Sequence, residues 1–250
     1  MNHFWHSPLL VFPVCLAAFW LAAQVGFLCR VWLHSPDEAR DDFDVVLTAT
    51  LTLLGLIIGF SFSMAISRYD QRKNYEEAEA NAIGTEYLRA ELLPGPDTVK
   101  IRGLLKQYLQ QRVQFYTTLD AHGLELINAA TSALQNELWE AVRGPAQAQP
   151  NALSGLAVAG MNDVLNSQGY SQAAWWNRIP TAAWQLMAAI ALCCNLMIGY
   201  RAHRRGALLF LIVPLAVSIS FFLIADIDSP RGGLIHVAPQ NLLSLEQALR

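Results

Sequence analysis

The stretch Asp44–Leu93 constrains this chain most, because it begins as a membrane span and continues as a polar helix. Its first half, residues 44–66, holds about 23 residues with no charged side chain after Asp44, which is long enough to cross the hydrocarbon core of a bilayer. Its second half, residues 67–93, turns abruptly polar and has no proline before Pro94. These helix-forming residues predict a single helix that continues for ~25 residues beyond the span.

Three further apolar runs accompany this one, and together they predict an all-α membrane protein with four transmembrane helices. Hydrophobic residues make up 54% of the chain and charged residues only 15%, whereas ordinary soluble domains are ~25% charged. The net charge of −3, without any long basic cluster, argues against a nucleic-acid partner. The four runs lie at residues 9–29, 45–66, 181–200 and 207–225.

Between the second and third spans, the sequence predicts a soluble helical block rather than a separate enzyme domain. Apolar residues recur at helical spacing in three segments, and a loop is predicted at residues 144–150. The tail ends in an amphipathic turn that is predicted to pack on the block. The predicted boundaries are residues 1–66 for the first two spans, 67–178 for the soluble block, 179–226 for the last two spans and 227–250 for the tail.

The second span carries small residues at every fourth position, namely Gly55, Gly59 and Ser63. Such a ridge lets another helix approach closely. The span also carries several hydroxyls, among them those of Thr50 and Thr52. One interpretation is ordinary helix packing, with the hydroxyls bonded to their own helix carbonyls. The other is a helix that lines a water-containing path.

Several motifs resemble one family. The second span and its end resemble the pore helix of the bestrophin channels: they carry Gly59-Phe60, then an apolar stretch, then Arg68 followed by aromatic Tyr69. More of the chain resembles the bacterial bestrophin-like domain family of unknown function. The segments that carry this resemblance are residues 67–94, the Arg-Ile-Pro motif at residues 178–180 and residues 224–240. The resemblance implies a bestrophin-like fold of four spans with an inserted helical block, in the bacterial inner membrane.

The resemblance also implies a site. Aligned on these motifs, the neck of the bestrophin pore falls at Thr52, Leu56 and Phe60, one helical turn apart on one face. Rings of Leu56 and Phe60 around an axis would form a hydrophobic constriction that gates by dewetting, and the ridge beside them would let neighbouring subunits pack. The implied function is therefore a homo-oligomeric channel, a pentamer as in the bestrophins, for small monovalent ions. The alternative is a non-conducting membrane scaffold or sensor.

Charged residues that follow the second span lead to two further predictions. Arg68 and Asp70 are predicted to be structural, with salt bridges that hold the helix where it leaves the membrane. Glu76, Glu77 and Glu79 form the richest acidic cluster, which is interpreted as a solvated face balanced by nearby basic residues. The alternative is that they form acidic rings in a vestibule, and this favours cations weakly over anions.

The sequence gives no support for catalysis, a cofactor or a metal site. It has no nucleophile elbow, P-loop or zinc-protease motif, so an enzyme is not expected. The four cysteines lie in or beside the spans without metal-ligand spacing. Asp226 and Asp228 stand where calcium-responsive bestrophins carry a longer acidic run, but Ca²⁺ takes six to eight oxygen ligands. A hydrogen bond and a salt bridge, to Arg231 for example, are expected of them instead.

The orientation in the membrane has two conflicting indications. The two short links between spans carry Arg30, Arg40, Arg201, Arg204 and Arg205, whereas the N-terminus carries no Lys or Arg. The positive-inside tendency would therefore place these links in the cytoplasm and the soluble block outside. The resemblance to bestrophins implies the opposite, a cytoplasmic block, and this is the expectation adopted.

Overall fold

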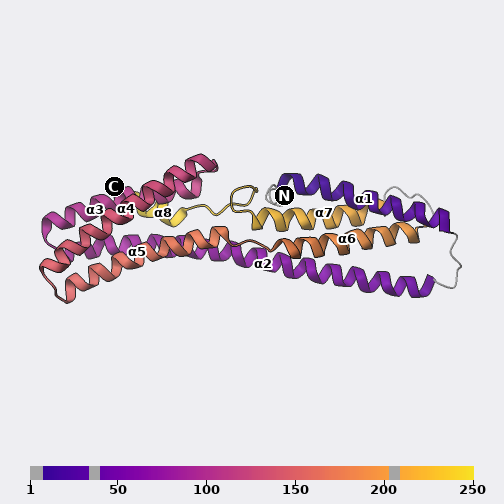
Figure 1. The fold of residues 1–250 in the computed structure, drawn as a ribbon, viewed down its shortest axis with the longest axis horizontal. Helices are drawn as coiled ribbons and strands as arrows, with labels where there is room; N and C mark the ends of the chain where they lie inside the picture. Colours follow the sequence, from indigo (N-terminus) through magenta and orange to yellow (C-terminus); the bar gives the residue numbers. More distant parts are fainter. Residues whose placement is uncertain (1–7, 34–39, 203–208) are drawn as a thin grey trace. The chain divides into compact units, whose positions relative to one another are not determined.

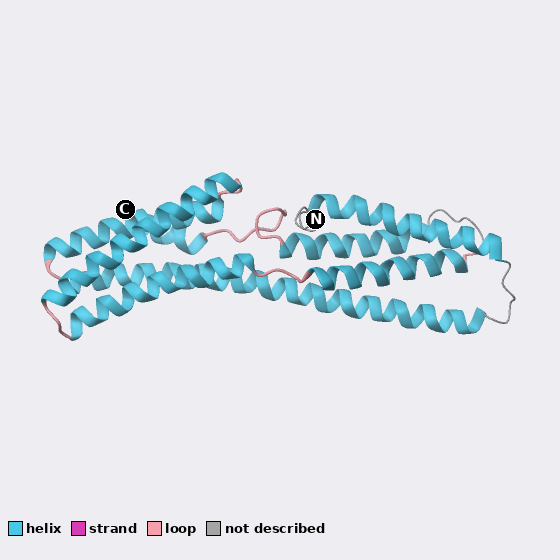
Figure 2. Cartoon of the chain, in the orientation of Figure 1, coloured by secondary structure: helices cyan, strands magenta, loops and turns pink. Residues whose placement is uncertain are grey.

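The computed structural model describes residues 8–33, 40–202 and 209–250, and every regular element in these ranges is a helix (Figures 1 and 2). The predicted all-α fold is confirmed, and the described residues contain four helices that are long and apolar enough to cross a membrane. The elements are α1 (Pro8–Leu33), α2 (Arg40–Arg89), η3 (Ala90–Leu92), α3 (Gly95–Thr117), α4 (Ala121–Ala148), α5 (Ala152–Trp176), α6 (Thr181–Arg201), α7 (Leu209–Asp228) and α8 (Gln240–Ala248).

The chain divides into two compact units, each built from two segments of sequence. The spanning unit comprises residues 1–69 and 178–236, and the helical unit comprises residues 70–177 and 237–250. Helix α2 belongs to both units and has no turn between Ile66 and Tyr75.

The segment that follows α7 belongs to the spanning unit up to residue 236, whereas the predicted tail began at residue 227. The buried carboxylate of Asp226 explains the difference, because it accepts hydrogen bonds from the backbone N–H of Leu234 at 2.7 Å and of Ile235 at 2.9 Å. Gly233 lies so close that a Cβ there would be 2.5 Å from Oδ1 of Asp226. The chain therefore folds back onto the end of α7.

In the spanning unit, α1 packs against both α6 and α7 (Figure 1). Aromatic rings fill the centre of its core: Phe221 meets Phe19 edge to face at 5.5 Å between ring centroids, and Trp184 at 6.0 Å. Helix α2 adds Leu54 and Ala65 to this core from one face only.

Two glycines bring the backbones of α1 and α6 into direct contact. A Cβ on Gly26 would lie 1.9 Å from the carbonyl oxygen of Leu196, and a Cβ on Gly199 would lie 1.9 Å from that of Ala23. No side chain fits at either position without moving a helix. Close approach at small residues is how helices associate in lipid, and the small-residue ridge predicted from the sequence does not include this pair.

In the helical unit, α3 packs on α4, α4 on α5, and α8 on α3. Asn151 caps α5, because its side chain accepts a hydrogen bond from the backbone N–H of Ser154 while the Ser154 hydroxyl accepts one from the backbone N–H of Asn151. The loop predicted at residues 144–150 begins later than expected, because α4 continues through Pro145 to Ala148 and only the last two residues of that range lie outside the helix. A proline removes a single helical hydrogen bond, and Gln149 N–H then donates to the carbonyl of Pro145 at 2.9 Å.

Candidate pore-lining helix and its supporting charges

Helix α2 is the least covered of the apolar helices. Only 11% of the residues in its most apolar stretch are buried, whereas the corresponding stretches of α1 and α7 are 28% and 50% buried. The buried side of α2 carries Leu54, Ser61 and Ala65, and these positions lie on one face of a helix. Within the part of the chain that the structure describes, no residue covers its opposite face.

The three positions predicted for the pore neck lie on this uncovered face. Phe60 is 62% exposed and Leu56 is 54% exposed, and Thr52 is exposed as well. Phe60 and Leu56 therefore present large apolar side chains that none of the described residues covers.

The small-residue ridge of α2 is uncovered too. A Cβ on Gly55 or on Gly59 would meet no atom of another described helix within 4 Å, and Ser63 is exposed. No other helix of the same chain packs against this ridge in the described residues, so its predicted role between subunits remains a prediction.

The hydroxyls of the second span bond to their own helix. Thr50 Oγ1 donates to the carbonyl of Val46 at 2.7 Å, and Thr52 Oγ1 donates to that of Thr48 at 2.8 Å. This is the back-bonding expected of threonine in a packed or lipid-facing helix. These hydroxyls therefore give no separate support for a water-containing path.

At the end of the apolar half of α2, Arg68 forms an ion pair with Asp228 at 3.2 Å. The same carboxylate accepts a hydrogen bond from the backbone N–H of Ile179, at 3.1 Å to its nearer oxygen. Burial lowers the pKa of the neighbouring Arg178, and the charge of Asp228 offsets part of that shift. Asp228 thus joins α7, α2 and the start of α6, whereas Asp70 is exposed and has no ion-pair partner among the described residues.

The acidic cluster was expected to lie on a solvated face or to line a vestibule, and most of it does neither. Glu76 and Glu79 are only 1% and 0% exposed, and Glu77 alone of the three is exposed. Glu76 receives hydrogen bonds from the Asn241 side chain at 2.6 Å and from the backbone N–H of Leu242 at 2.9 Å. Its carboxylate therefore fastens the start of α8 to α2.

Glu79 pairs with Arg112 of α3 at the centre of the helical unit, and neither side chain is exposed. The hydroxyl of Tyr116 shares a hydrogen bond with Ser171 of α5 at 2.7 Å and also reaches Glu79 at 3.4 Å. Burial lowers the pKa of Arg112, but the charge of Glu79 and the nearby phenols raise it by more, so the pKa is raised overall. The pair is therefore an ionic link among α2, α3 and α5.

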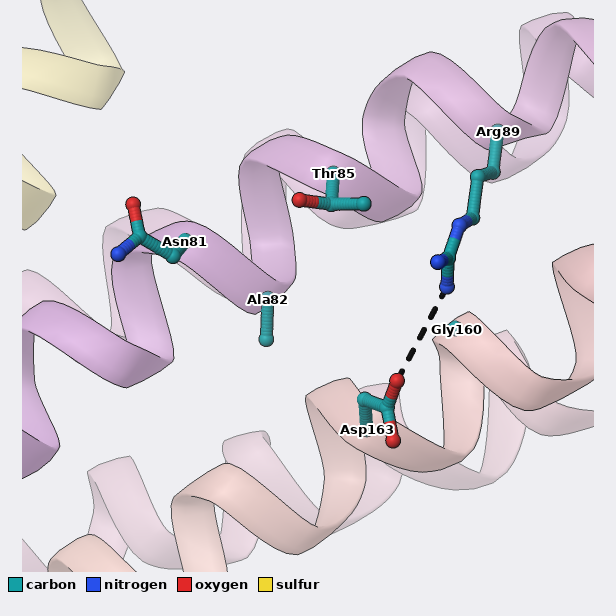
Figure 3. A pocket seen from close by; sticks show the side chains of 6 residues that line it. All are labelled: Asn81, Ala82, Thr85, Arg89, Gly160 and Asp163. Carbon is teal, nitrogen blue, oxygen red and sulfur yellow. Dashed lines mark ion pairs between the residues drawn. The ribbon is translucent and has the colours of Figure 1, made fainter.

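A pocket of about 250 Å³ lies between α2 and α5 in the helical unit (Figure 3). Arg89 extends from α2 towards Asp163 on α5, and the two form an ion pair of 3.9 Å beside Gly160. The other lining residues are Asn81, Ala82 and Thr85. The pocket is not among the sites predicted from the sequence.

A family model for the Bestrophin-like domain matches residues 15–242. The chain belongs to the Bestrophin-like domain family. The match includes all four spans except the first residues of α1, so the family assignment made from the sequence is confirmed.

Solved structures agree with this assignment at the level of the fold. A point variant of a bacterial bestrophin homologue from Klebsiella pneumoniae superposes with a TM-score of 0.67 at 14% identity, covering 95% of this chain and 97% of that one. A second crystal structure of that homologue superposes with a TM-score of 0.66 at 14% sequence identity, covering 94% of this chain and 96% of that one. The crystal structure of a point variant of a membrane protein superposes with a TM-score of 0.66 at 13% sequence identity, covering 95% of this chain and 97% of that one. No curated protein matches the chain significantly.

In this bestrophin-like chain, the carboxylates near α7 are occupied by protein donors. Asp226 holds the backbone of Leu234 and Ile235, and Asp228 pairs with Arg68. Among residues 8–33, 40–202 and 209–250, no group of three or more His, Cys, Asp or Glu side chains is placed to hold a metal ion.

Replacing Arg68 by alanine should lower the free energy of unfolding by about 1–3 kcal/mol, because Asp228 would lose a charged partner while remaining largely buried. The expected readout is a lower melting temperature for the purified chain in detergent. Asp70→Ala is the matched control and should stay within about 0.5 kcal/mol of wild type, because Asp70 is exposed. If Arg68→Ala changes ion preference and leaves stability and assembly untouched, Arg68 belongs to the conducting path instead.

Proposed function

We propose that this chain forms a homo-oligomeric channel, a pentamer, that passes small monovalent ions along an axis lined by α2. The observation that carries the proposal is the uncovered apolar face of α2 with Phe60 and Leu56 at its centre. A single chain cannot enclose a path, so the pathway needs several copies of this helix. Membership of the Bestrophin-like domain family and the likeness to a bestrophin homologue's fold support the same arrangement.

In this proposal, Thr52, Leu56 and Phe60 form the neck and Gly55, Gly59 and Ser63 form the contact between neighbouring α2 helices. Apolar rings hold back water because a wetted neck offers water no hydrogen-bond partners. The open space beside both glycines leaves room for a neighbouring helix. The proposed setting is the bacterial inner membrane, with the helical unit in the cytoplasm.

The proposal carries no preference for cations over anions. The preference for cations rested on Glu76, Glu77 and Glu79, and two of these are buried and engaged in hydrogen bonds. Of these three glutamates, only Glu77 is exposed and could form a solvent-facing ring. Recordings under a salt gradient in a lipid bilayer give the sign of the permeant ion directly.

Shortening the neck should raise conductance. Leu56→Ala and Phe60→Ala, alone and together, remove apolar surface from the proposed constriction, so water should enter it more readily and single-channel current in a planar bilayer should rise severalfold. Leu186→Ala is the matched control, because Leu186 on α6 is 53% exposed, like Leu56 at 54%. It should leave the current unchanged.

A non-conducting scaffold or sensor is the second candidate, and the back-bonded threonines of α2 are compatible with it. The subunit number of the purified particle separates the two candidates, because a monomer or a dimer has no central pore. Such a particle, or silent bilayers for wild type and both neck variants, would establish the scaffold. A pentamer with currents that respond only to the neck variants would establish the channel.

A further inference from the structure

Glu86 is a buried acid whose carboxyl group has no hydrogen-bond partner among the described residues. It lies on α2 in the helical unit and is 0% exposed. Neither of its carboxylate oxygens has a hydrogen-bond partner in the described residues. A carboxylate in that position would lose its hydration with no compensating donor, which is far less favourable for the charged than for the neutral form.

Helix α5 meets this side chain at a glycine. A Cβ on Gly160 would lie 2.0 Å from Oε2 of Glu86 and 2.6 Å from a guanidinium nitrogen of Arg89. Any larger residue at position 160 would therefore push the carboxyl group away. The carboxyl group of Glu86 is thus held in the contact between α2 and α5.

Two charged groups face Glu86, one from each helix. Arg89 lies one turn further along α2 and forms an ion pair with Asp163 of α5 (Figure 3). Burial raises the pKa of Glu86 from 4.5 to about 8, Arg89 acts to lower it, and Asp163 acts to raise it. The proton is therefore retained at neutral pH and released in the mildly alkaline range.

We propose that the α2–α5 contact around Glu86 is a proton-sensitive switch, closed while Glu86 is neutral and loosened when Glu86 releases its proton to solvent. Once ionised, the carboxylate attracts Arg89 away from Asp163, and solvent enters between the two helices to hydrate the charge. The pocket lined by Arg89, Asp163 and Gly160 supplies the space for that rearrangement. This device does not depend on whether the chain conducts ions.

The direction of the stability effect follows from proton binding. Between the ordinary pKa of 4.5 and about 8, the folded state keeps a proton that the unfolded state has lost. Stability therefore falls as pH rises through this interval and levels off above it. Glu86→Gln, which stays neutral, should abolish that dependence, so the variant should melt at a higher temperature than wild type at pH 8.

Infrared difference spectroscopy of the full chain in detergent tests the protonation itself. We expect a protonated carboxylic acid band at pH 7 that disappears with a midpoint near pH 8 and is absent from Glu86→Gln. Asp163→Asn should move the midpoint down and Arg89→Gln should move it up, because they remove charges of opposite sign. A band that titrates below pH 6, or midpoints that do not move in opposite directions, would overturn the proposal.

Hydrogen exchange followed by mass spectrometry tests the opening. Backbone amides of α5 around Gly160 should lose protection in wild type between pH 7 and pH 9, relative to Glu86→Gln measured at the same pH. The comparison at equal pH removes the intrinsic pH dependence of exchange. Equal protection in the two proteins at pH 9 would show that ionisation does not open the contact.

Discussion

Replacing Glu79 by alanine should destabilise the helical unit by about 3–5 kcal/mol, because Arg112 would remain charged and fully buried without its partner. Tyr116 would lose an acceptor as well. Folded domains are stable by only about 5–15 kcal/mol, so a large part of the stability would be lost. Denaturant unfolding of the full chain in detergent, followed by circular dichroism, measures the effect.

The double variant Glu79→Leu/Arg112→Leu shows whether the loss in Glu79→Ala comes from the unpaired charge of Arg112 or from the absence of the ion pair itself. Removing both charges should recover most of the loss, because a buried ion pair and apolar residues of similar volume often differ little in stability. Glu77→Ala is the matched control on the same turn of α2, and it should change stability by less than about 0.5 kcal/mol because Glu77 is exposed. A Glu79→Ala variant as stable as that control would contradict an ionic link at the centre of the unit.

The spans could be predicted from sequence because lipid restricts the options so strongly. Residues 45–66 and 181–200 are long apolar runs, and only a helix satisfies their backbone groups inside a bilayer. The continuation of α2 past Arg68 followed from local propensity, since nothing there breaks a helix. Both inferences depend on neighbours in sequence, which is why they could be made without a structure.

The buried charges could not be predicted in the same way. Composition places Glu76 and Glu79 on the surface, since glutamate is almost never fully buried unless paired. Their partners Leu242 and Arg112 lie 166 and 33 residues away, so no local pattern reveals the pairing. One signal was present, because positions 76, 79, 83 and 86 continue the helical stripe of the buried positions 61 and 65.

The assignment of the neck residues does not follow from the sequence pattern of α2. The apolar pattern of α2 is equally compatible with contact to lipid, to another helix or to a pore axis, and one chain contains no symmetry axis. Leu56 and Phe60 are 54% and 62% exposed, and none of the described residues of the chain covers them. Only the family resemblance selects these positions as a neck.

Replacing Gly199 or Gly26 by alanine should disrupt the packing of α1 on α6. Alanine favours a helix over glycine by about 1 kcal/mol, but overpacking in a close-packed core costs about 1–3 kcal/mol and occasionally more. Here the new methyl would lie 1.9 Å from a carbonyl oxygen of the opposite backbone, which cannot rotate away as a side chain would. The overpacking cost therefore outweighs the gain in helix propensity, and we expect a net loss of about 2 kcal/mol or more.

The same substitution elsewhere in the chain separates crowding from helix propensity. Gly103→Ala in α3 places its methyl in open space, so it should be neutral or stabilising by up to about 1 kcal/mol. Gly55→Ala should also leave the folded subunit intact, because the new methyl would have no atom of another described helix within 4 Å. Any effect of this substitution should be a lower subunit number in the detergent particle. Melting temperature and particle mass, measured together, therefore distinguish contact within a subunit from contact between subunits. If Gly199→Ala melted at the same temperature as Gly103→Ala, the backbones of α1 and α6 could not be in contact as described.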